Sequence, residues 1–393
     1  MKLVFGQTGS NIATVQVTLD AGSSVEYDKW TPGIAHLAEH MVFQGSTKMS
    51  HKELMCTMAR LGVSWNAYTS HSRVCFFINA PHENIEEATK HFSDMILHRK
   101  ITQESLDKER LVVLEEERGS QDDVDSKIYE SLNAFLCEGP LSMPILGSRD
   151  SISSITLDEI NRFFDHYYKP SRMLVTITSP NPDHQRLGEL FGKPTRFKYS
   201  SKAPNVYRKQ RRKVLEVEGI QQSRVFITYR AFPIGHKDAL NIQFLEHFLS
   251  RGMDSRLFET LRQKHGLCYS AGSMLYSTND VGWLIFWTET APEHIDKAVR
   301  LIGKEIKNLL ADGPTTEEMD RAKNKFLSSF YEKIETSYGL NSILSYRALN
   351  KLPKVDVSVN RIKHMTKKKV MDSAENLFQK GNRQVFICKP EEK

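Results

Sequence analysis

Residues 33–46 read GIAHLAEHMVFQGS, and at their centre His36, Glu39 and His40 follow the order His-x-x-Glu-His. The apolar residues between them are spaced as in a helix, where residues four apart share a face, so the two imidazoles point the same way. Two imidazoles at this spacing can bind one zinc ion, and Glu39 lies beside their face, where it can accept a proton from a metal-bound water. Such a pair is also common as an ordinary core or surface pair, so the motif needs support from elsewhere in the chain.

A catalytic zinc site needs a third protein ligand and one open position. The segment ERLVVLEEE, residues 109–117, offers carboxylates at helical spacing. Glu109 and Glu116 are two turns apart and share a face, which apolar residues flank. A carboxylate in such a place is costly unless it is paired or bound to a metal. Glu115 and Glu117 are further candidates, but they point to other parts of the helix.

The chain contains an internal repeat, because four segments recur in the same order at offsets between 207 and 213 residues. These pairs are 36–45 with 243–252, 79–88 with 290–298, 102–110 with 315–323, and 173–180 with 383–390. One order at nearly one spacing indicates two copies of one domain of ordinary size.

The second copy keeps the motif's outline and loses most of its ligands. Glu39 and His40 recur as Glu246 and His247. The other replacements are Gln243 for His36, Ala322 for Glu109 and Ser329 for Glu116. Joint loss is expected if these residues form one metal site and is odd if each is structural. The comparison therefore favours a zinc site in the first copy.

We predict an N-terminal zinc-binding domain at 1–190, a proline-containing and basic linker at 191–213, and a homologous C-terminal domain at 214–393 without the metal site. The first copy predicts three strands and four helices. The strands are expected at 14–20, 73–79 and 172–178, and the helices at 33–46, 50–61, 83–98 and 103–118. Regular βαβ alternation is missing. We therefore expect an α+β fold in which each domain packs helices on a largely antiparallel sheet.

Composition excludes several classes of protein. Hydrophobic residues make up 39% of the chain and charged residues 26%, as in an ordinary globular protein. No apolar run is long enough for a transmembrane helix, and the N-terminus lacks the apolar core of a signal peptide, so we expect no membrane contact and a cytoplasmic location.

The five scattered cysteines fit reduced thiols. They are Cys56, Cys75, Cys137, Cys268 and Cys388. The basic runs at 208–213 and 367–369 are weak evidence for nucleic-acid binding, and no nucleic-acid partner is expected.

Several segments together resemble the pitrilysin, insulysin and mitochondrial processing peptidase family, the inverted zincins. They are HLAEHMVFQGS at 36–46, WNAYTS at 65–70, ERLVVLEEE at 109–117, MPILGS at 143–148 and SRLFETLRQKHGLCYS at 255–270. The likeness covers nearly the whole chain, and its two-domain length is similar to the small bacterial-type branch.

The resemblance implies a role for each matching residue. It makes His36, His40 and Glu116 the ligands of one zinc ion per chain, with Glu39 as the general base. It implies that Glu109 supports the ligands without touching the metal. The substrate-binding residues that it implies are Asn66 and Ala67 at a sheet edge, and Arg262 and Tyr269 from the second domain. Arg262 and Tyr269 are then expected to orient the peptide or to stabilise an oxyanion.

The chain departs from the family pattern after Asn66. An acidic residue and a threonine usually follow the NAYTS-like segment, but this chain has His71 and Arg73 there. The family's usual glycine pair before Asn66 is reduced to Gly62. These differences make the substrate groove more positively charged than the family pattern and favour acidic peptides. They do not touch the expected zinc ligands.

The main hypothesis is a zinc endopeptidase that cleaves peptides or unfolded polypeptide segments held in extended form. The resemblance implies a homodimer that closes into a clamshell chamber around the peptide. The alternative is a non-catalytic structural or partner subunit, similar to the processing-peptidase relatives of respiratory complexes. A third reading, a basic protein associated with nucleic acid, depends only on the 208–213 run.

Overall fold

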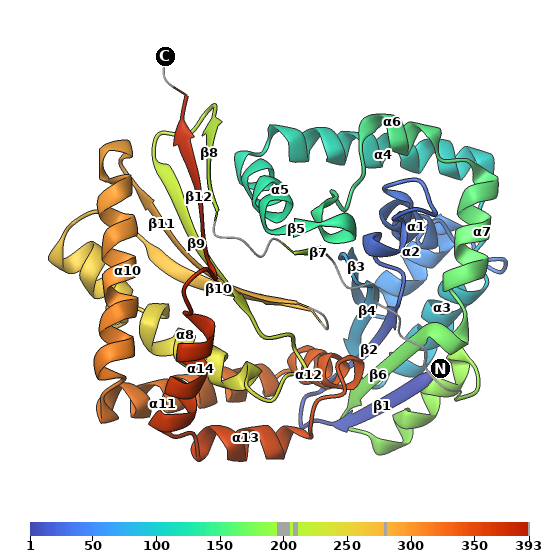
Figure 1. The fold of residues 1–393 in the computed structure, drawn as a ribbon. Coiled ribbons are helices and arrows are strands. Elements are labelled where there is room, and N and C mark those ends of the chain that lie inside the picture. Colours follow the sequence, from blue (N-terminus) through green and yellow to red (C-terminus); the bar gives the residue numbers. More distant parts are fainter. Residues whose placement is uncertain (195–204, 207–210, 279–280, 392–393) are drawn as a thin grey trace. The chain divides into compact units, whose positions relative to one another are not determined.

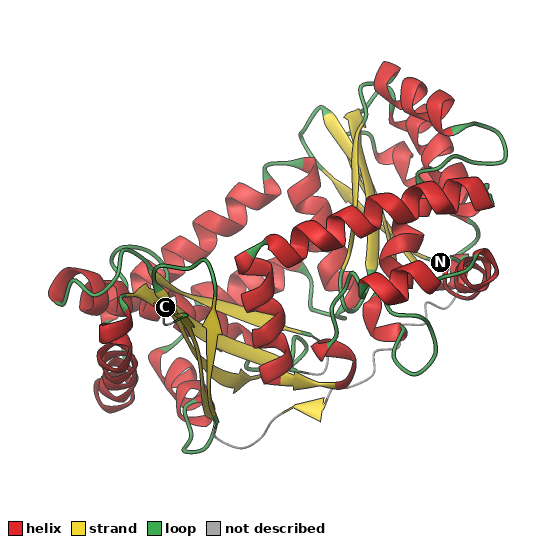
Figure 2. Ribbon diagram, turned by 90° about the horizontal axis from the view of Figure 1, so that it is seen from above, coloured by secondary structure: helices red, strands yellow, loops and turns green. Residues whose placement is uncertain are grey.

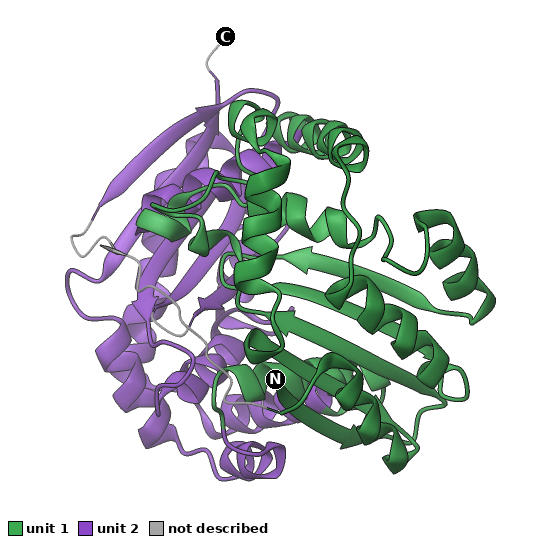
Figure 3. Cartoon of the chain, turned by 90° about the vertical axis from the view of Figure 1, so that its right-hand side faces the viewer, with its two compact units in different colours: residues 1–122, 139–202, 331–352 green, residues 123–138, 203–330, 353–393 purple. Residues whose placement is uncertain are grey.

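The computed structural model describes residues 1–194, 205–206, 211–278 and 281–391. Two compact units make up the chain, as the colours of Figure 3 show. Unit 1 consists of residues 1–122, 139–202 and 331–352. Unit 2 consists of residues 123–138, 203–330 and 353–393.

A five-stranded sheet lies at the centre of unit 1, with the strand order β1–β6–β2–β4–β3 (Figure 1). Its strands are β1 Lys2–Gln7, β2 Ile12–Leu19, β3 Ser64–Thr69, β4 Val74–Pro81 and β6 Met173–Ser179. Only β1 and β6 are parallel neighbours, and the other neighbouring pairs are antiparallel. The prediction of a largely antiparallel sheet is therefore confirmed for this unit.

Helices pack on both faces of this sheet, because its strands alternate between two kinds of side chain. On β2, Val15 and Val17 face the hydrophobic core, whereas Thr14 and Gln16 face helix α12. The α-helices of unit 1 are α1 Ile34–Val42, α2 His51–Arg60, α3 Ile85–Leu97, α4 Gln103–Asp122, α6 Arg149–Ser154, α7 Leu157–Tyr167 and α12 Ser337–Leu349. Its 3-10 helices are η1 Ser23–Val25, η2 Gly139–Ser142, η3 Pro170–Arg172 and η4 Pro182–Phe191.

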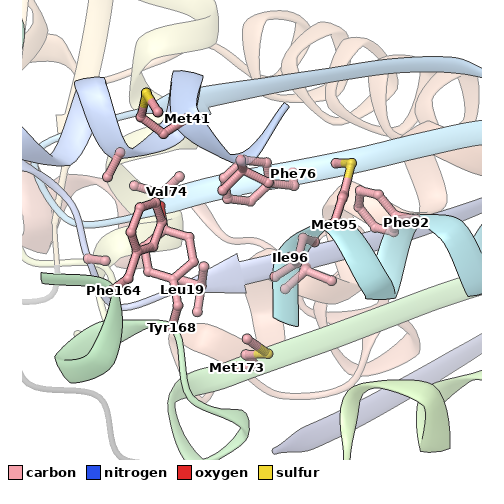
Figure 4. Close-up of a cluster of buried hydrophobic side chains, with 14 of the residues drawn as sticks. Leu19, Met41, Val74, Phe76, Phe92, Met95, Ile96, Phe164, Tyr168 and Met173 are labelled. Atoms are coloured by element: carbon pink, nitrogen blue, oxygen red, sulfur yellow. The ribbon is translucent and has the colours of Figure 1, made fainter. Parts of the chain in front are cut away.

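The hydrophobic core of unit 1 joins α1, α3 and α7 to the sheet. Figure 4 shows Phe76 of β4 between Met41 of α1 and the side chains of α3. Phe76, Phe92 and Phe164 are all almost fully buried. This packing holds α1, which carries the His-x-x-Glu-His motif, against the sheet.

Unit 2 repeats the same sheet topology, with the strand order β10–β11–β9–β12–β8. Its strands are β8 Arg212–Val217, β9 Ser223–Ala231, β10 Ala271–Ser277, β11 Gly282–Thr290 and β12 Arg383–Pro390. The pair β12–β8 is again the parallel one. A further two-stranded ribbon joins β5 Cys137–Glu138 to β7 Asn205–Val206. The matching order and direction of the strands agree with two copies of one domain.

Helices also lie against the strands of unit 2, as Figure 2 shows in red and yellow. They are α5 Val124–Leu136, α8 Ala239–Ser250, α9 Arg256–Phe258, the π-helix η5 Glu259–Lys264, the turn η6 Pro292–His294, α10 Ile295–Asp312, α11 Thr316–Ile334, α13 Val355–Lys363 and α14 Lys367–Leu377. Helix α11 extends past the boundary of the unit at residue 330.

The two units exchange one helix each relative to the halves of the sequence. Helix α5, from the first half, packs on the sheet of unit 2, where Phe135 lies 5.4 Å from Phe386 between ring centroids. Helix α12, from the second half, packs on the sheet of unit 1, where Asn341 donates hydrogen bonds to the carbonyls of Thr14 and Thr176. The first residues of α5 and α12 are 213 residues apart, the offset of the repeat. The compact units therefore have other boundaries than the predicted domains 1–190 and 214–393. Those ranges describe the two copies of the sequence repeat, and they stay a prediction.

The predicted elements of the first copy are confirmed with small shifts of their ends. The three strands appear as β2, β4 and β6, and the four helices as α1 to α4. The helix expected over 33–46 ends earlier, at Val42, because Gly45 adopts a φ of 111° and forms a bridge with Ser50. Much of the predicted linker, at 195–204 and 207–210, lies outside the described residues.

Two further observations concern the whole chain. All five cysteines are free thiols, as expected. Among the helices that the structure describes, none is both long enough and apolar enough to cross a membrane.

Candidate metal centre

The start of helix α1 is fixed by two backbone contacts. Gly33 precedes the helix with a φ of 92°, a conformation that favours glycine, and its backbone lies against that of Leu146 and Gly147. The carboxyl group of Glu26 accepts hydrogen bonds from the backbone N–H groups of Gly33 (2.9 Å) and Ala35 (2.8 Å). These bonds satisfy donors that a helix start leaves open and set the position of the motif that follows.

The structure brings the three expected metal ligands together. The Nε2 atom of His36 lies 3.7 Å from Glu116 Oε1, and the Nε2 atom of His40 lies 3.4 Å from Glu116 Oε2. One ligand atom from each of these residues lies within 4.8 Å of the others. Two imidazole nitrogens and one carboxylate oxygen on one side of a site form a donor set that suits zinc. Glu115 and Glu117 are not part of this group.

A second carboxylate lies on the other side of His40. Glu109 Oε2 is 3.3 Å from His40 Nδ1, the ring nitrogen opposite the one that faces Glu116. The Nε2 group of Gln44 donates a 2.7 Å hydrogen bond to Glu109 Oε1. A carboxylate in this place fixes the ring orientation of a metal-binding histidine. The sequence does not indicate this role for Gln44, which lies just beyond the end of α1 and four residues after His40.

The pKa values of the two histidines are shifted in opposite directions. Burial, followed by the charge of His40, lowers the pKa of His36 to about 4, so this ring is neutral at pH 7. Burial would also lower the pKa of His40, but hydrogen bonds to Glu109 and Glu116 outweigh it and raise the pKa to about 9. The hydrogen bond with His40 in turn lowers the pKa of Glu116. The raised pKa favours the protonated form of His40 at pH 7, between the carboxyl groups of Glu109 and Glu116.

The carboxylate of Glu39 lies beside the ligand group and is held by strand β3. Thr69, the last residue of β3, donates a 2.5 Å hydrogen bond from Oγ1 to Glu39 Oε2. Glu39 is buried, and this burial raises its pKa although the bond from Thr69 acts in the opposite direction. A buried carboxyl group with a raised pKa next to a candidate metal site is suited to proton transfer. Thr69 was also overlooked, since only the folded chain shows its contact with Glu39.

Asn66 and Ala67 lie on β3, which is an edge strand of the unit 1 sheet. Within the described residues β3 pairs with β4 alone, with Asn66 opposite Phe77 and Ala67 opposite Phe76. The N–H group of Ala67 donates a 2.8 Å hydrogen bond to the side-chain oxygen of Asn66. An edge strand is able to pair with an added peptide strand, which would take the place of the Asn66 side chain at the Ala67 N–H.

Arg262 and Tyr269 lie together in unit 2. The guanidinium carbon of Arg262 is 4.6 Å from the centre of the Tyr269 ring and 5.1 Å from that of Phe258. Arg262 belongs to the π-helix η5, an element often found at functional sites. Tyr269 is 75% exposed, so the pair has a surface able to meet a ligand. Their expected role in substrate binding stays a prediction.

The two residues that depart from the family pattern help to build the turn between β3 and β4. The ring of His71 is buried, and its Nε2 atom lies 3.1 Å from the carbonyl of Met143. The backbone N–H of Arg73 donates to the hydroxyl of Ser70. A preference for acidic peptides stays a prediction.

In the second copy, the buried glutamate has protein partners, and no group with metal-binding spacing is found among the described residues around it. Glu246 accepts a 2.9 Å hydrogen bond from Ser273 and lies 3.4 Å from the Nε atom of Arg251. The ring of His247 bonds to the carbonyl of Gln243, within the same helix. Across the described residues, the group of His36, His40 and Glu116 is the one found to have metal-binding spacing. Of the predicted basic run, residues 208–210 lie outside the described residues, and Arg212 pairs with Asp296.

Comparison with known proteins gives consistent matches along the chain. Residues 4–149 match the model described as insulinase (peptidase family M16), and residues 154–326 match the model described as peptidase M16 inactive domain. An uncharacterized zinc protease, YmxG, of Bacillus subtilis is 26% identical, with 88% of this chain and 86% of that protein covered. Subunit 1 of the mitochondrial cytochrome b-c1 complex of Caenorhabditis elegans is 25% identical, covering 92% of this chain and 81% of that protein.

The fold is also similar to solved structures. The crystal structure of a peptidase M16 inactive domain from Pseudomonas fluorescens matches with a TM-score of 0.88 at 16% identity. The match covers 99% of this chain and 95% of that one. At this identity, the likeness concerns the fold alone, and it agrees with the predicted α+β architecture of two similar domains.

Proposed function

Because the chain belongs to peptidase family M16, we propose that it is a zinc-dependent endopeptidase that hydrolyses peptides or unfolded polypeptide segments. The observation that carries this proposal is the convergence of His36, His40 and Glu116 beside the buried carboxyl group of Glu39. The relatives named zinc proteases support the choice of metal. One zinc ion per chain is expected, since one such group is found in the described residues.

The proposed ligands fit zinc by their chemistry and by their support. His36 and His40 offer neutral nitrogen donors once His40 has lost its proton, and Glu116 offers a carboxylate oxygen. Glu109 holds the far nitrogen of His40, as the partners of metal-binding histidines do. A bound zinc ion lowers the pKa of its water toward neutrality and polarises a carbonyl group.

The residues of the chain then divide the work of peptide hydrolysis. Glu39 accepts the proton of the attacking water and passes it to the leaving amine. Asn66 and Ala67 on β3 pair with the backbone of an extended peptide, which gives affinity with little demand on sequence. Arg262 and Tyr269 of unit 2 are proposed to orient the peptide or to stabilise an oxyanion.

Two substitutions test this proposal. Glu39→Gln should keep zinc and lose hydrolysis of a quenched fluorescent peptide, because the ligands remain and the base is gone. His36→Ala should lose both zinc and hydrolysis. Elemental analysis of each protein, before and after treatment with a chelator, measures the zinc content per chain. Cleavage by Glu39→Gln at the parental rate would contradict the mechanism, and full zinc content in His36→Ala would contradict the ligand assignment.

A second candidate function is a non-catalytic subunit of a larger assembly. The relative named as a subunit of the cytochrome b-c1 complex favours it, and so does the match to a domain model described as inactive. The intact ligand group and Glu39 favour the peptidase. Purified protein that binds zinc but cleaves no member of a diverse peptide library would support the subunit.

The quaternary and cellular parts of the proposal rest on the family resemblance. We propose a homodimer enclosing a peptide-sized chamber in the cytoplasm. Light scattering of the zinc-loaded protein tests the dimer, for which a monomeric mass would be the contrary result. Resistance of folded proteins to cleavage, with unfolded ones cleaved, tests the chamber.

A further inference from the structure

We infer that Thr69 is a positioning residue that fixes Glu39 relative to strand β3, an inference that rests on the proposed peptidase function. Its hydroxyl group donates a 2.5 Å hydrogen bond to Glu39 Oε2. A glutamate side chain has several rotatable bonds, so a short hydrogen bond to one oxygen restricts where the other oxygen lies. Oε1 then remains in one place to receive the proton of the attacking water.

The strand end that carries Thr69 is itself held firmly. In the turn after β3, the carbonyl of Ser70 accepts a hydrogen bond from Ser23 N (3.1 Å), and the carbonyl of His71 accepts one from Ser24 N (2.8 Å). The preceding residue, Gly22, approaches the turn so closely that a Cβ there would overlap the backbone of Ser70. The turn is therefore fastened to η1.

The same segment also holds helix α1, so the contacts form a closed ring. Glu26 directly follows η1, and its carboxyl group bonds to the backbone N–H groups of Gly33 and Ala35 at the start of α1. The ring runs from Thr69 through the turn, η1 and Glu26 to α1, and returns through Glu39 to Thr69. The hydroxyl group of Thr69 is the link that joins the general base to this frame.

The position of Thr69 on β3 has a consequence for catalysis. Asn66 and Ala67, proposed to pair with the substrate backbone, lie three and two residues earlier on the same strand, respectively. The strand that places the peptide thus also places the base. Proton transfer is sensitive to small misplacements of the base, so loss of this bond should lower the rate of the chemical step more than substrate binding.

A purely structural role of Thr69 predicts a different effect on stability, zinc affinity and rate. If the hydroxyl only satisfied a buried carboxylate, its loss would lower stability and zinc affinity, and the rate would fall in proportion to the zinc lost. A positioning role lowers kcat in protein that still holds its zinc and binds its substrate.

The test compares Thr69→Ser with Thr69→Ala, which differ only by the hydroxyl group, and adds the similarly shaped Thr69→Val. Thr228→Val is the matched control, because the buried hydroxyl of Thr228 in unit 2 finds no hydrogen-bond partner among the described residues. Each zinc-loaded variant is measured for kcat and KM on one fluorescent peptide, for zinc affinity by chelator competition, and for thermal unfolding.

We expect Thr69→Ala and Thr69→Val to lose about tenfold to a hundredfold in kcat, with KM and zinc affinity within about threefold of the parent. Thr69→Ser should recover most of kcat, and Thr228→Val should match the parent. Equal kcat in the serine and alanine variants, or zinc affinity falling in parallel with kcat, would overturn the inference alone. A zinc-loaded parent that cleaves no peptide would overturn the proposed function, and this inference with it.

Discussion

Zinc binding to this chain should compete with one proton on His40. The metal-free histidine has a pKa of about 9, because Glu109 and Glu116 hold its charged form. His36, with a pKa of about 4, is already neutral at pH 7. A metal ion can bind only the unprotonated ring, so at pH 7 the proton on His40 must leave first.

The size of the effect follows from the distance between pH 7 and that pKa. Two pH units correspond to about a hundredfold in apparent zinc affinity, or about 3 kcal/mol. The apparent zinc affinity should rise with pH, by about tenfold per pH unit, until it levels off near pH 9. Because His36 contributes no proton in this range, the slope should be one rather than two.

Chelator competition between pH 6 and 9.5, corrected for the protonation of the chelator, measures this profile. Calorimetry in buffers of different ionisation enthalpy should give about one proton released per zinc at pH 7. Glu109→Gln should move the plateau to lower pH by removing one of the charges that hold the proton. Glu117→Gln, on the same helix but outside the ligand group, is the control and should leave the profile unchanged. A flat profile, or a slope of two, would refute the reasoning.

Three further outcomes are expected. Gln44→Leu removes the hydrogen bond that holds the carboxyl group of Glu109 behind His40. Zinc affinity, measured by chelator competition, should therefore fall about tenfold, and an unchanged affinity would show that Gln44 does not support the site. Phe76→Ala should lower the free energy of unfolding in urea by about 3–5 kcal/mol, because this ring is fully buried in the core, whereas exposed Leu111→Ala should change it little. Burial would raise the pKa of Glu318, but the hydrogen bonds from Arg256 outweigh burial and lower this pKa in the folded protein. The ionised Glu318 therefore stabilises the fold fully above its usual pKa of 4.5, and this stabilisation is lost as the pH falls through the lower pKa of the folded state. Glu318→Gln should therefore lose less stability on acidification, and equal acid sensitivity in thermal unfolding would contradict this.

Local patterns in the sequence were enough to locate the main elements and to bring His36, His40 and Glu116 together as candidate ligands. The alternation of β2 and the helical spacing of His36 and His40 depend on neighbours along the chain, and both are found as expected. Glu109 and Glu116 were placed on one face by the same periodicity, and both contact His40. The family resemblance is confirmed by the matched family models.

Features that depend on contacts between distant segments were not predictable in this way. The bond between Thr69 and Glu39 joins a strand end to a helix, and neither local pattern indicates it. The exchange of α5 and α12 is a second example. Helix α12 attaches to its sheet through buried polar groups such as Asn341 rather than an apolar stripe, so its hydrophobic pattern does not reveal a packed face.

The second copy shows what a buried glutamate requires when no metal is near. Gln44 lies just beyond the end of α1 in the first copy, and Arg251 occupies its position just beyond the end of α8 in the second. There the guanidinium group lies against Glu246, the counterpart of Glu39, and supplies the positive charge that burial of a carboxylate demands. This change comes in addition to the replacement of His36, Glu109 and Glu116 in the second copy. Restoring the histidine and the glutamates in the second copy would place a new cation site next to a fixed positive charge, so Arg251 would also have to be replaced before zinc could bind.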